Sequence, residues 1–303
     1  MRIVSLLPSA TEIVCALDLR DQLVGVTHRC DYPPEIEGVA VITRPLGTAV
    51  GGADAVSAVA YAVDDIGPFE LDVDAFLECR PDLVLVRDGA GPGMDQVRRV
   101  LKDFAGERPE VVSLDPVSVE GIFHTVTTIG AMAEAEDEAL GLLEVLREDL
   151  SELEQQVVAR RDEGIRACRV VVLEGFDPPV LCGRWVPEQV RRAGGWEVLG
   201  REGQPAAATT WEAIQDVDPE MLILAPAGIH LPAAKRTWQR LEKPELWTDL
   251  EAVRRGHVFI VEPLYFSRPG PRIVDGVGML AEIFDPDGFI ETSPVASWTP
   301  LIR

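Results

Sequence analysis

Short apolar runs alternate with longer amphipathic segments along most of the chain. The runs are rich in β-branched residues and have the length of buried strands. They lie at residues 3–7, 23–27, 83–86 and 111–114 in the first part of the chain, and at 170–173, 221–224 and 258–261 in the second. Strands that alternate with amphipathic helices predict parallel sheets covered by helices on both faces, so we expect an α/β fold.

The segment between these two parts has a different pattern. Residues 134–161 contain no proline, and their only glycine is Gly141. Leucine or valine recurs at positions 143, 146, 150, 153 and 157, which predicts one amphipathic helix with a narrow apolar face. About 28 residues at 1.5 Å each would span about 40 Å, the width of a lobe. We expect this helix to cross both lobes, and a coiled-coil dimer is the alternative.

A sequence pattern that occurs once in each part indicates that the two parts are similar lobes. Residues 74–86 and 212–224 both run from an acidic residue and alanine, through apolar positions, to proline, a second acid and four apolar residues. Each stretch predicts a short helix, a proline stop and a buried strand. The expected division is an N-terminal lobe at 1–130, a connecting backbone helix at 131–163 and a C-terminal lobe at 164–303.

The charge balance excludes some classes of partner. The 28 basic residues face 51 acidic ones, which gives a formal net charge of −23. A surface this acidic repels nucleic acid and anionic lipid, so neither is expected as a main partner. We expect a monomer that binds a small molecule.

The cysteines and the N-terminus bear on the compartment. Cys15, Cys30, Cys79, Cys168 and Cys182 have no metal-ligand spacing, and we expect buried free thiols. The opening residues lack the apolar stretch and the cleavage site of a signal peptide. The sequence as written therefore predicts a cytoplasmic protein, and a trimmed periplasmic or extracellular protein is the alternative.

Several motifs resemble one family in order along the chain. The opening RIVSLLPSATEI at 2–13 and GVTHRCDYPP at 25–34 resemble the start of vitamin B12-type binding proteins. Further matching motifs are RPDLVL at 80–85, GRWVPE at 183–188, AVRRGHV at 252–258 and YFSRPGPR at 265–272. The chain thus resembles the helical-backbone (class III) substrate-binding proteins of ABC transporters, in their cobalamin-binding branch.

This resemblance implies a fold and a function. It implies two Rossmann-like lobes with parallel sheets joined by one long backbone helix, and a metal chelate held in the cleft. It also implies a binding protein rather than an enzyme, with an ABC transporter permease as a partner. Asp74 and Glu212 would match the paired carboxylates that dock onto such a transporter. Their alternative role is that of ordinary acids at helix N-termini, where the helix dipole favours them.

The chain departs from one part of the branch. Members without signal peptides carry a Cys-rich loop, a Pro-Cys-Gly motif and a Gly-His-Trp motif. The corresponding positions here are 87–91, 226–228 and 183–185, and they contain neither cysteine nor histidine. We therefore expect no protein metal site and no resident cofactor.

Candidate binding residues come from loops at the carboxyl ends of the predicted strands, where doubly wound sheets bind ligands. The candidates are Ser9, His28, Arg29, Tyr32, Arg44, Arg87, Arg184, Trp185, Tyr265, Phe266 and Arg268. The arginines predict an anionic ligand, because guanidinium groups pair with carboxylate or phosphate. Alternatively, each of these arginines pairs with a nearby Asp or Glu on the surface and does not contact a ligand.

The other candidates have alternatives too. His28 is the best candidate for an axial or metal contact, or else a loop hydrogen-bonding residue. Trp185, Tyr265 and Phe266 would stack on a flat macrocycle or belong to the lobe core.

We place a corrinoid first as the ligand. An anionic ferric siderophore or haem is the alternative, as is a cytosolic carrier or sensor. An NAD-dependent enzyme is a remote alternative, because the glycines at 89, 91 and 93 are followed by Met94 where the dinucleotide motif needs glycine.

Overall fold

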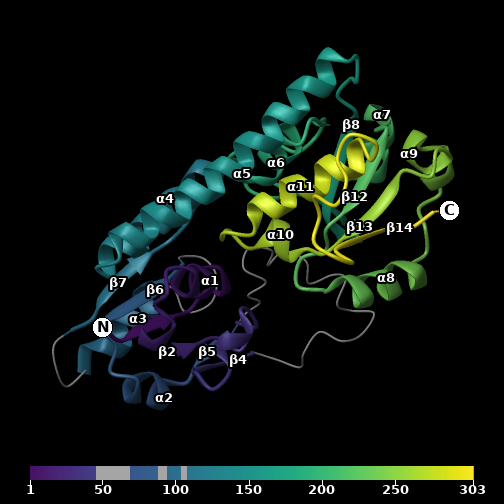
Figure 1. Cartoon of the computed structure of the whole chain (residues 1–303). Coiled ribbons are helices and arrows are strands. Elements are labelled where there is room, and N and C mark those ends of the chain that lie inside the picture. Colours follow the sequence, from purple (N-terminus) through teal and green to yellow (C-terminus); the bar gives the residue numbers. More distant parts are fainter. Residues whose placement is uncertain (46–68, 88–93, 104–107, 303) are drawn as a thin grey trace.

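The computed structural model describes residues 1–45, 69–87, 94–103 and 108–302. The described chain forms two α/β lobes, with a long helix running along one side of both (Figure 1). Within these ranges, no helix combines the length and the apolar composition needed to cross a membrane.

The N-terminal lobe is built on a parallel sheet in the order β3-β2-β1-β6-β7. Its strands are β1 (Ile3–Ser5), β2 (Leu23–Val26), β3 (Ala40–Val41), β6 (Leu83–Val86) and β7 (Glu110–Ser113). A separate antiparallel pair is formed by β4 (Thr43–Pro45) and β5 (Phe69–Leu71). The helices are α1 (Pro8–Ala16), α2 (Val73–Glu78), α3 (Met94–Val100) and α4 (Val119–Met132).

Sequence features account for these elements. Every residue of β6 is apolar and buried, as expected of a strand covered on both faces. The helix α1 has Pro8 in its first turn. Proline is tolerated there because the N–H groups of the first turn have no partner within the helix. The side chain of Ser118 caps α4 by accepting a hydrogen bond from Gly121 N at 3.0 Å.

The C-terminal lobe has a mixed sheet in the order β11-β9-β8-β12-β13-β14, with β10 also paired to β8. Its strands are β8 (Arg169–Phe176), β9 (Pro179–Leu181), β10 (Trp196–Glu197), β11 (Ala207–Ala208), β12 (Met221–Leu224), β13 (Val258–Val261) and β14 (Trp298–Pro300). Its helices are α6 (Val186–Arg192), α7 (Trp211–Val217), α8 (Leu231–Arg240), α9 (Glu251–Arg254), α10 (Leu264–Ser267) and α11 (Ile273–Phe284).

The expected parallel arrangement is confirmed for the centre of this sheet, where β8, β12 and β13 are parallel. Antiparallel strands lie toward its edges, which the sequence did not predict. Only Asp177 and Pro178 separate β8 from β9, and so short a connection permits antiparallel pairing alone.

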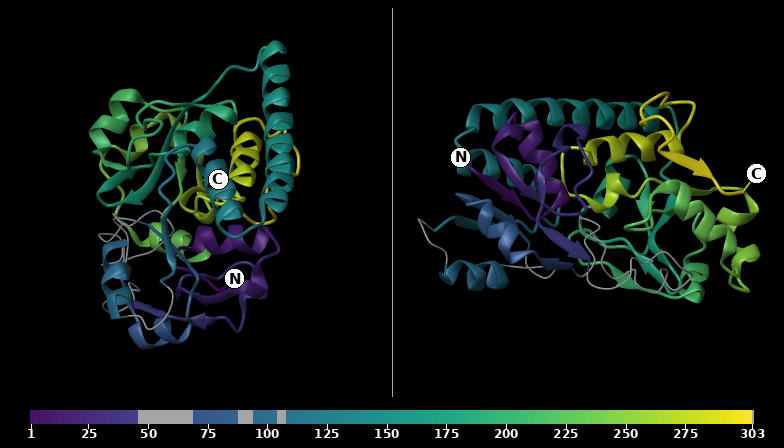
Figure 2. Two further views of the ribbon diagram at one scale, coloured as in Figure 1. Left: turned by 90° about the vertical axis from the view of Figure 1, so that its left-hand side faces the viewer. Right: turned by 90° about the horizontal axis from the view of Figure 1, so that it is seen from below.

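The predicted long helix is α5 (Glu136–Asp162). Leu143, Leu146, Leu150 and Val157 are buried on its inner face, which contacts α4 of one lobe and α11 of the other. Figure 2 shows the long teal helix α5 running alongside both lobes. Since its apolar face is covered by its own chain, the coiled-coil dimer is not needed to explain the pattern.

Candidate ligand-binding cleft

A pocket lies where the strand-end loops of the two lobes meet. The N-terminal lobe contributes loop residues that follow β2, and the C-terminal lobe contributes loops that follow β12 and β13. The lining residues are His28, Arg29, Asp31, Gly228, Ile229, His230, Pro263, Leu264 and Arg268. The cavity volume is about 70 Å³, well below the roughly 300–1,000 Å³ of sites that enclose a drug-sized ligand. The described pocket is therefore too small to enclose a macrocycle.

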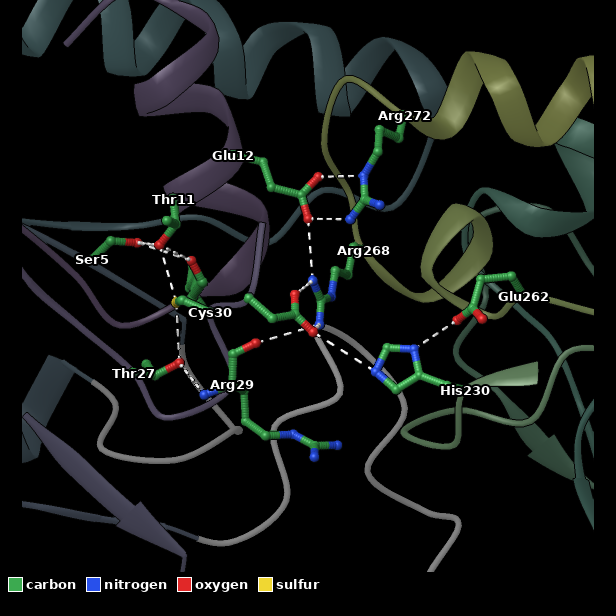
Figure 3. Close-up of polar contacts among 12 residues, drawn as sticks. Ser5, Thr11, Glu12, Thr27, Arg29, Cys30, His230, Glu262, Arg268 and Arg272 are labelled. Atoms are coloured by element: carbon green, nitrogen blue, oxygen red, sulfur yellow. Dashed lines mark hydrogen bonds and ion pairs between the residues drawn. The ribbon is translucent and has the colours of Figure 1, made fainter. Parts of the chain in front are cut away.

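A network of ion pairs adjoins the pocket and links the two lobes (Figure 3). We call Glu12, Asp31, Arg268 and Arg272 the inter-lobe network. Arg272 Nε donates to Glu12 Oε2 at 2.9 Å, and Arg268 Nη1 lies 3.3 Å from Glu12 Oε1 and 2.6 Å from Asp31 Oδ1. Both Glu12 and Arg268 are only 3% exposed. Each bond joins the N-terminal lobe to the C-terminal lobe, so the network fixes how the lobes meet.

The network has defined electrostatics. Burial raises the pKa of Asp31, but the hydrogen bond and charge of Arg268 outweigh it and hold that pKa below its usual value. The Arg272 guanidinium also stacks between aromatic rings, 4.2 Å from the ring centre of Tyr32 and 5.5 Å from that of Tyr265. The predicted ligand residue Arg268 lines the pocket, yet its guanidinium binds the protein's own carboxylates.

A second ionic link spans the cleft at the other side of the sheet. Asp115, just after β7, accepts from Arg87 Nη2 at 2.8 Å and from Arg184 Nη1 at 3.1 Å. Arg184 belongs to the C-terminal lobe and follows Gly183. A Cβ at Gly183 would lie 2.3 Å from Gln204 O, so only glycine allows this loop packing. We call Arg87, Asp115 and Arg184 the Asp115 bridge.

Arg44 lies apart from both groups of residues. Its guanidinium pairs with Glu70 at 3.0 Å across β4 and β5, and its side chain is 67% exposed. Of the five predicted arginines, Arg29 and Arg268 line the described pocket. The structure thus brings together fewer cationic groups than the sequence predicted, because local acids engage most of them.

His28 lines the pocket and is hydrogen bonded locally. Its backbone N donates to Thr43 Oγ1 at 2.9 Å, and its ring Nδ1 lies 2.8 Å from the same oxygen. The ring also meets the edge of Phe69. Burial, helped by the nearby charge of Arg29, lowers the pKa of His28. These contacts match its alternative role as a loop hydrogen-bonding residue.

The aromatic candidates divide between core and surface. Trp185 is 1% exposed and donates its Nε1–H to Phe266 O at 2.9 Å, and Phe266 is buried as well. Both rings therefore belong to the lobe core. Tyr32 is exposed and Tyr265 is half-buried, and both flank Arg272. Ser9 is buried in α1.

Sequence reasoning missed several residues that shape the cleft. It did not single out Glu12, Asp115 or Glu262, and it left His230 without a role. The sequence signal for Glu12 is that it is followed by the apolar residues Ile13 and Val14 in a short helix. A carboxylate that is buried with such neighbours needs a counter-ion. The partner was not predictable, since Arg268 and Arg272 lie far away in the sequence.

The sequence pattern repeated at residues 74–86 and 212–224 forms equivalent elements in the two lobes. Asp74 and Glu212 lie exposed in the first turns of α2 and α7, each a short helix that precedes a sheet strand. The caps are Asp72, which accepts from Ala75 N, and Thr210, which accepts from Ala213 N. The two acids thus occupy equivalent places in the two lobes.

Among the described residues, no group of three or more histidines, cysteines or acids is placed to hold a metal ion. The glycine-rich stretch at 89–93 lies outside the described residues.

Residues 3–264 match the model of the periplasmic binding protein family, and the chain belongs to that family. A substrate-binding lipoprotein of an ABC transporter from Bacillus subtilis, YvrC, is 26% identical over 298 residues, covering 96% of this chain and 82% of the relative. A vitamin B12-binding protein from Vibrio cholerae is 23% identical over 286 residues, covering 91% and 86% of the two chains.

Solved structures share the fold. A periplasmic heme-binding protein from Pseudomonas aeruginosa matches with a TM-score of 0.71 and 22% identity, over 94% of this chain and 93% of the other. The vitamin B12-binding protein BtuF of Vibrio cholerae matches with a TM-score of 0.66 and 19% identity, over 94% and 96%. The two-lobed class III architecture is confirmed.

The family also decides the class of activity. The chain is a substrate-binding protein of the ABC transporter type and not an enzyme, as the sequence predicted.

The prediction of a cytoplasmic protein is wrong, because the family consists of periplasmic binding proteins and the Bacillus relative is a lipoprotein. That prediction relied on the first residues of the given sequence. Leaders are removed from mature exported chains, so the point at which a given sequence begins does not determine the compartment.

Proposed function

We propose that the protein binds a corrinoid in the inter-lobe cleft and delivers it to an ABC transporter permease. The observation that carries the proposal is the pocket itself, which lies between the carboxyl ends of both sheets and is lined by His28, Arg29 and His230. Ligands of doubly wound folds bind at such strand ends. The relatives described as vitamin B12-binding proteins support a corrinoid as the ligand.

An anionic metal chelate is the second candidate, and Arg29 favours it. Arg29 lines the pocket, and its Nη2 donates to Gly228 O at 3.4 Å. A carboxylate-bearing chelate such as haem would pair with this group. The shared fold of the Pseudomonas heme-binding protein is compatible with such a ligand.

Titration of the purified protein distinguishes these ligands. Cyanocobalamin, cobinamide, hemin and a ferric hydroxamate siderophore are added separately, and binding is followed by heat and by the visible spectrum. We expect saturable binding of a corrinoid. A flat corrinoid titration with saturable hemin binding would replace the first candidate by the second, and no binding of any chelate would overturn both.

We further propose that Asp74 and Glu212 dock the protein onto the permease, because they are exposed at equivalent positions of the two lobes. The double variant Asp74→Asn, Glu212→Gln should lower stimulation of the cognate transporter's ATPase and leave ligand affinity unchanged. The matched control neutralises Glu78 and Asp216, two other exposed acids of the same helices. Equal effects of the two double variants would reject specific docking.

A further inference from the structure

His230 lies between two carboxylates at the pocket, one from each lobe (Figure 3). On the side of the C-terminal lobe, its ring Nδ1 lies 3.1 Å from Glu262 Oε1. The other oxygen of Glu262 accepts from Leu231 N at 3.0 Å, which fixes this carboxylate at the first turn of α8. On the side of the N-terminal lobe, the ring Nε2 lies 3.7 Å from Asp31 Oδ2. One imidazole therefore faces an acid of each lobe.

The two contacts depend differently on the charge of the ring. An ionised carboxylate only accepts hydrogen bonds, so the nitrogen that faces Glu262 carries a proton in the neutral ring and in the charged ring. The 3.7 Å between Nε2 and Asp31 is too long for a hydrogen bond, and this contact is attractive as an ion pair when Nε2 is protonated. In the neutral ring Nε2 presents a lone pair to the Asp31 carboxylate, and the attraction is lost. The proton on Nε2 therefore controls only the contact that crosses between the lobes.

Asp31 keeps its charge throughout the pH range in which a histidine titrates, about pH 5 to 8. Burial raises the pKa of Asp31, but the hydrogen bond and charge of Arg268, followed by the charge of His230, hold that pKa below its usual value. A change of charge in this pH range therefore falls on the ring and not on the carboxylate.

The other charged and titratable side chains around the pocket do not replace this contact. The described ones that line the pocket beside His230 and Asp31 are those of His28, Arg29 and Arg268. Arg268 is held by Asp31 and Glu12, and the ring of His28 lies against Thr43 within the N-terminal lobe. The positive charge of Arg29 opposes protonation of His230, while the two carboxylates on its ring nitrogens favour it.

We propose that His230 acts as a proton-operated latch between the lobes at the pocket. Its protonated ring links Asp31 of the N-terminal lobe to Glu262 of the C-terminal lobe, and loss of the Nε2 proton to solvent releases Asp31. The ring then stays on Glu262, so only the inter-lobe contact is broken. This latch is a property of the ligand-free chain and does not depend on which chelate the cleft binds.

The latch is strongest below neutral pH. Because the protonated ring is the form that pairs with Asp31, the contact is complete near about pH 5 and is lost by about pH 8. The side chains of His230 and Asp31 are 58% and 45% exposed. An ion pair this accessible changes an equilibrium by at most about fivefold. The latch thus adjusts how readily the pocket opens, while the buried pair of Glu12 with Arg268 is independent of it.

Amide hydrogen exchange of the ligand-free protein tests the latch. Exchange at residues 28–32 is followed by mass spectrometry at several pH values in the wild type and in His230→Gln, whose amide does not titrate. Both proteins have the same sequence at 28–32, so the ratio of their rates cancels the intrinsic pH dependence of exchange. We expect the wild type to exchange about two- to fivefold more slowly near about pH 5, with a ratio close to one near about pH 8.5.

Two further variants separate the charge of the ring from its place in the structure. His230→Lys keeps a positive charge over the whole range, so the slow exchange should persist at high pH. His124→Gln removes an exposed histidine of α4 outside the pocket and should reproduce the wild-type pH profile.

The pH profile distinguishes a latch from an ordinary surface histidine. A ratio of wild type to His230→Gln that is the same at low and high pH would overturn the latch. A His230→Lys profile that loses protection with rising pH as the wild type does would overturn it as well. The chelate titrations test the proposed function alone, since the latch is measured without a ligand.

Discussion

The inter-lobe network and the pocket beside it contain the same kinds of side chain but use them differently. In the network, Glu12 and Arg268 are both 3% exposed and satisfy each other's charge across the lobes. In the pocket, Arg29 and His230 are lining residues, and Arg29 Nη2 lies 3.4 Å from Gly228 O, across the cleft. The comparison indicates that the carboxylates beside an arginine decide whether its guanidinium joins the two lobes.

Other contacts place the network within a rigid frame. Glu188 of α6 in the C-terminal lobe accepts from Val119 N at 2.9 Å, so a buried carboxylate of one lobe caps α4 of the other. A negative charge at a helix N-terminus is favoured by the helix dipole. Together with the contacts of α5 to α4 and α11, these links join the two lobes at several places.

The largest expected effect is on stability. Glu12→Gln removes the charge that compensates Arg268 and Arg272, and loss of one partner from a buried ion pair costs about 3–5 kcal/mol. Urea unfolding at pH 7 should show this loss. The control Glu70→Gln breaks the exposed pair with Arg44 and should cost less than about 1 kcal/mol. Equal effects of the two variants would mean that the network contributes no more than a surface pair.

Much of the fold was predictable because its signals are local. Continuous apolar runs marked β6 and β12, and leucines at helical spacing marked α5. The strands that the sequence missed, such as β11 and β14, are short and lack fully buried residues. Such strands bury too little apolar surface to leave a periodic pattern.

The site was less predictable because its contacts are long-range. The sequence located the strand-end loops and named Arg29, Arg268 and His28 among their residues. It could not show that Glu12, far from Arg268 in the chain, lies beside it in space. Nor could it show that Trp185 is buried, with its indole N–H bonded to the backbone of the α10 segment.

The second expected effect is on affinity. Arg29→Ala removes a guanidinium from the pocket, and a hydrogen bond to a charged group contributes about 1.5–3 kcal/mol. The Kd for an anionic chelate such as hemin should therefore rise about 10- to 100-fold, with little change in urea unfolding. Arg44→Ala is the matched control and should leave the Kd unchanged. An unchanged Kd in Arg29→Ala would show that this guanidinium does not touch the ligand.

The smallest expected effect concerns Asp31, which belongs to both regions. Its pKa is lower in the folded protein than the usual 3.8, so the unfolded state takes up its proton first as the pH falls. The stability from Asp31 is therefore complete above about pH 4 and is lost on further acidification. In Asp31→Asn, the free energy of unfolding should therefore fall less steeply as the pH drops below about 4. Its cost at pH 7 should be about 1 kcal/mol or less, because the side chain is 45% exposed and Arg268 keeps Glu12 as a partner.

Urea unfolding at several pH values between 3 and 7 measures this effect, with Asp74→Asn on α2 as the control that keeps the wild-type dependence on pH. The control is suitable because Asp74 is exposed in the first turn of its helix. If Asp31→Asn lost as much stability as Glu12→Gln, the ion pair of Asp31 with Arg268 would contribute as much as the fully buried pair. The contrast between network and pocket would then fail at Asp31, which belongs to both.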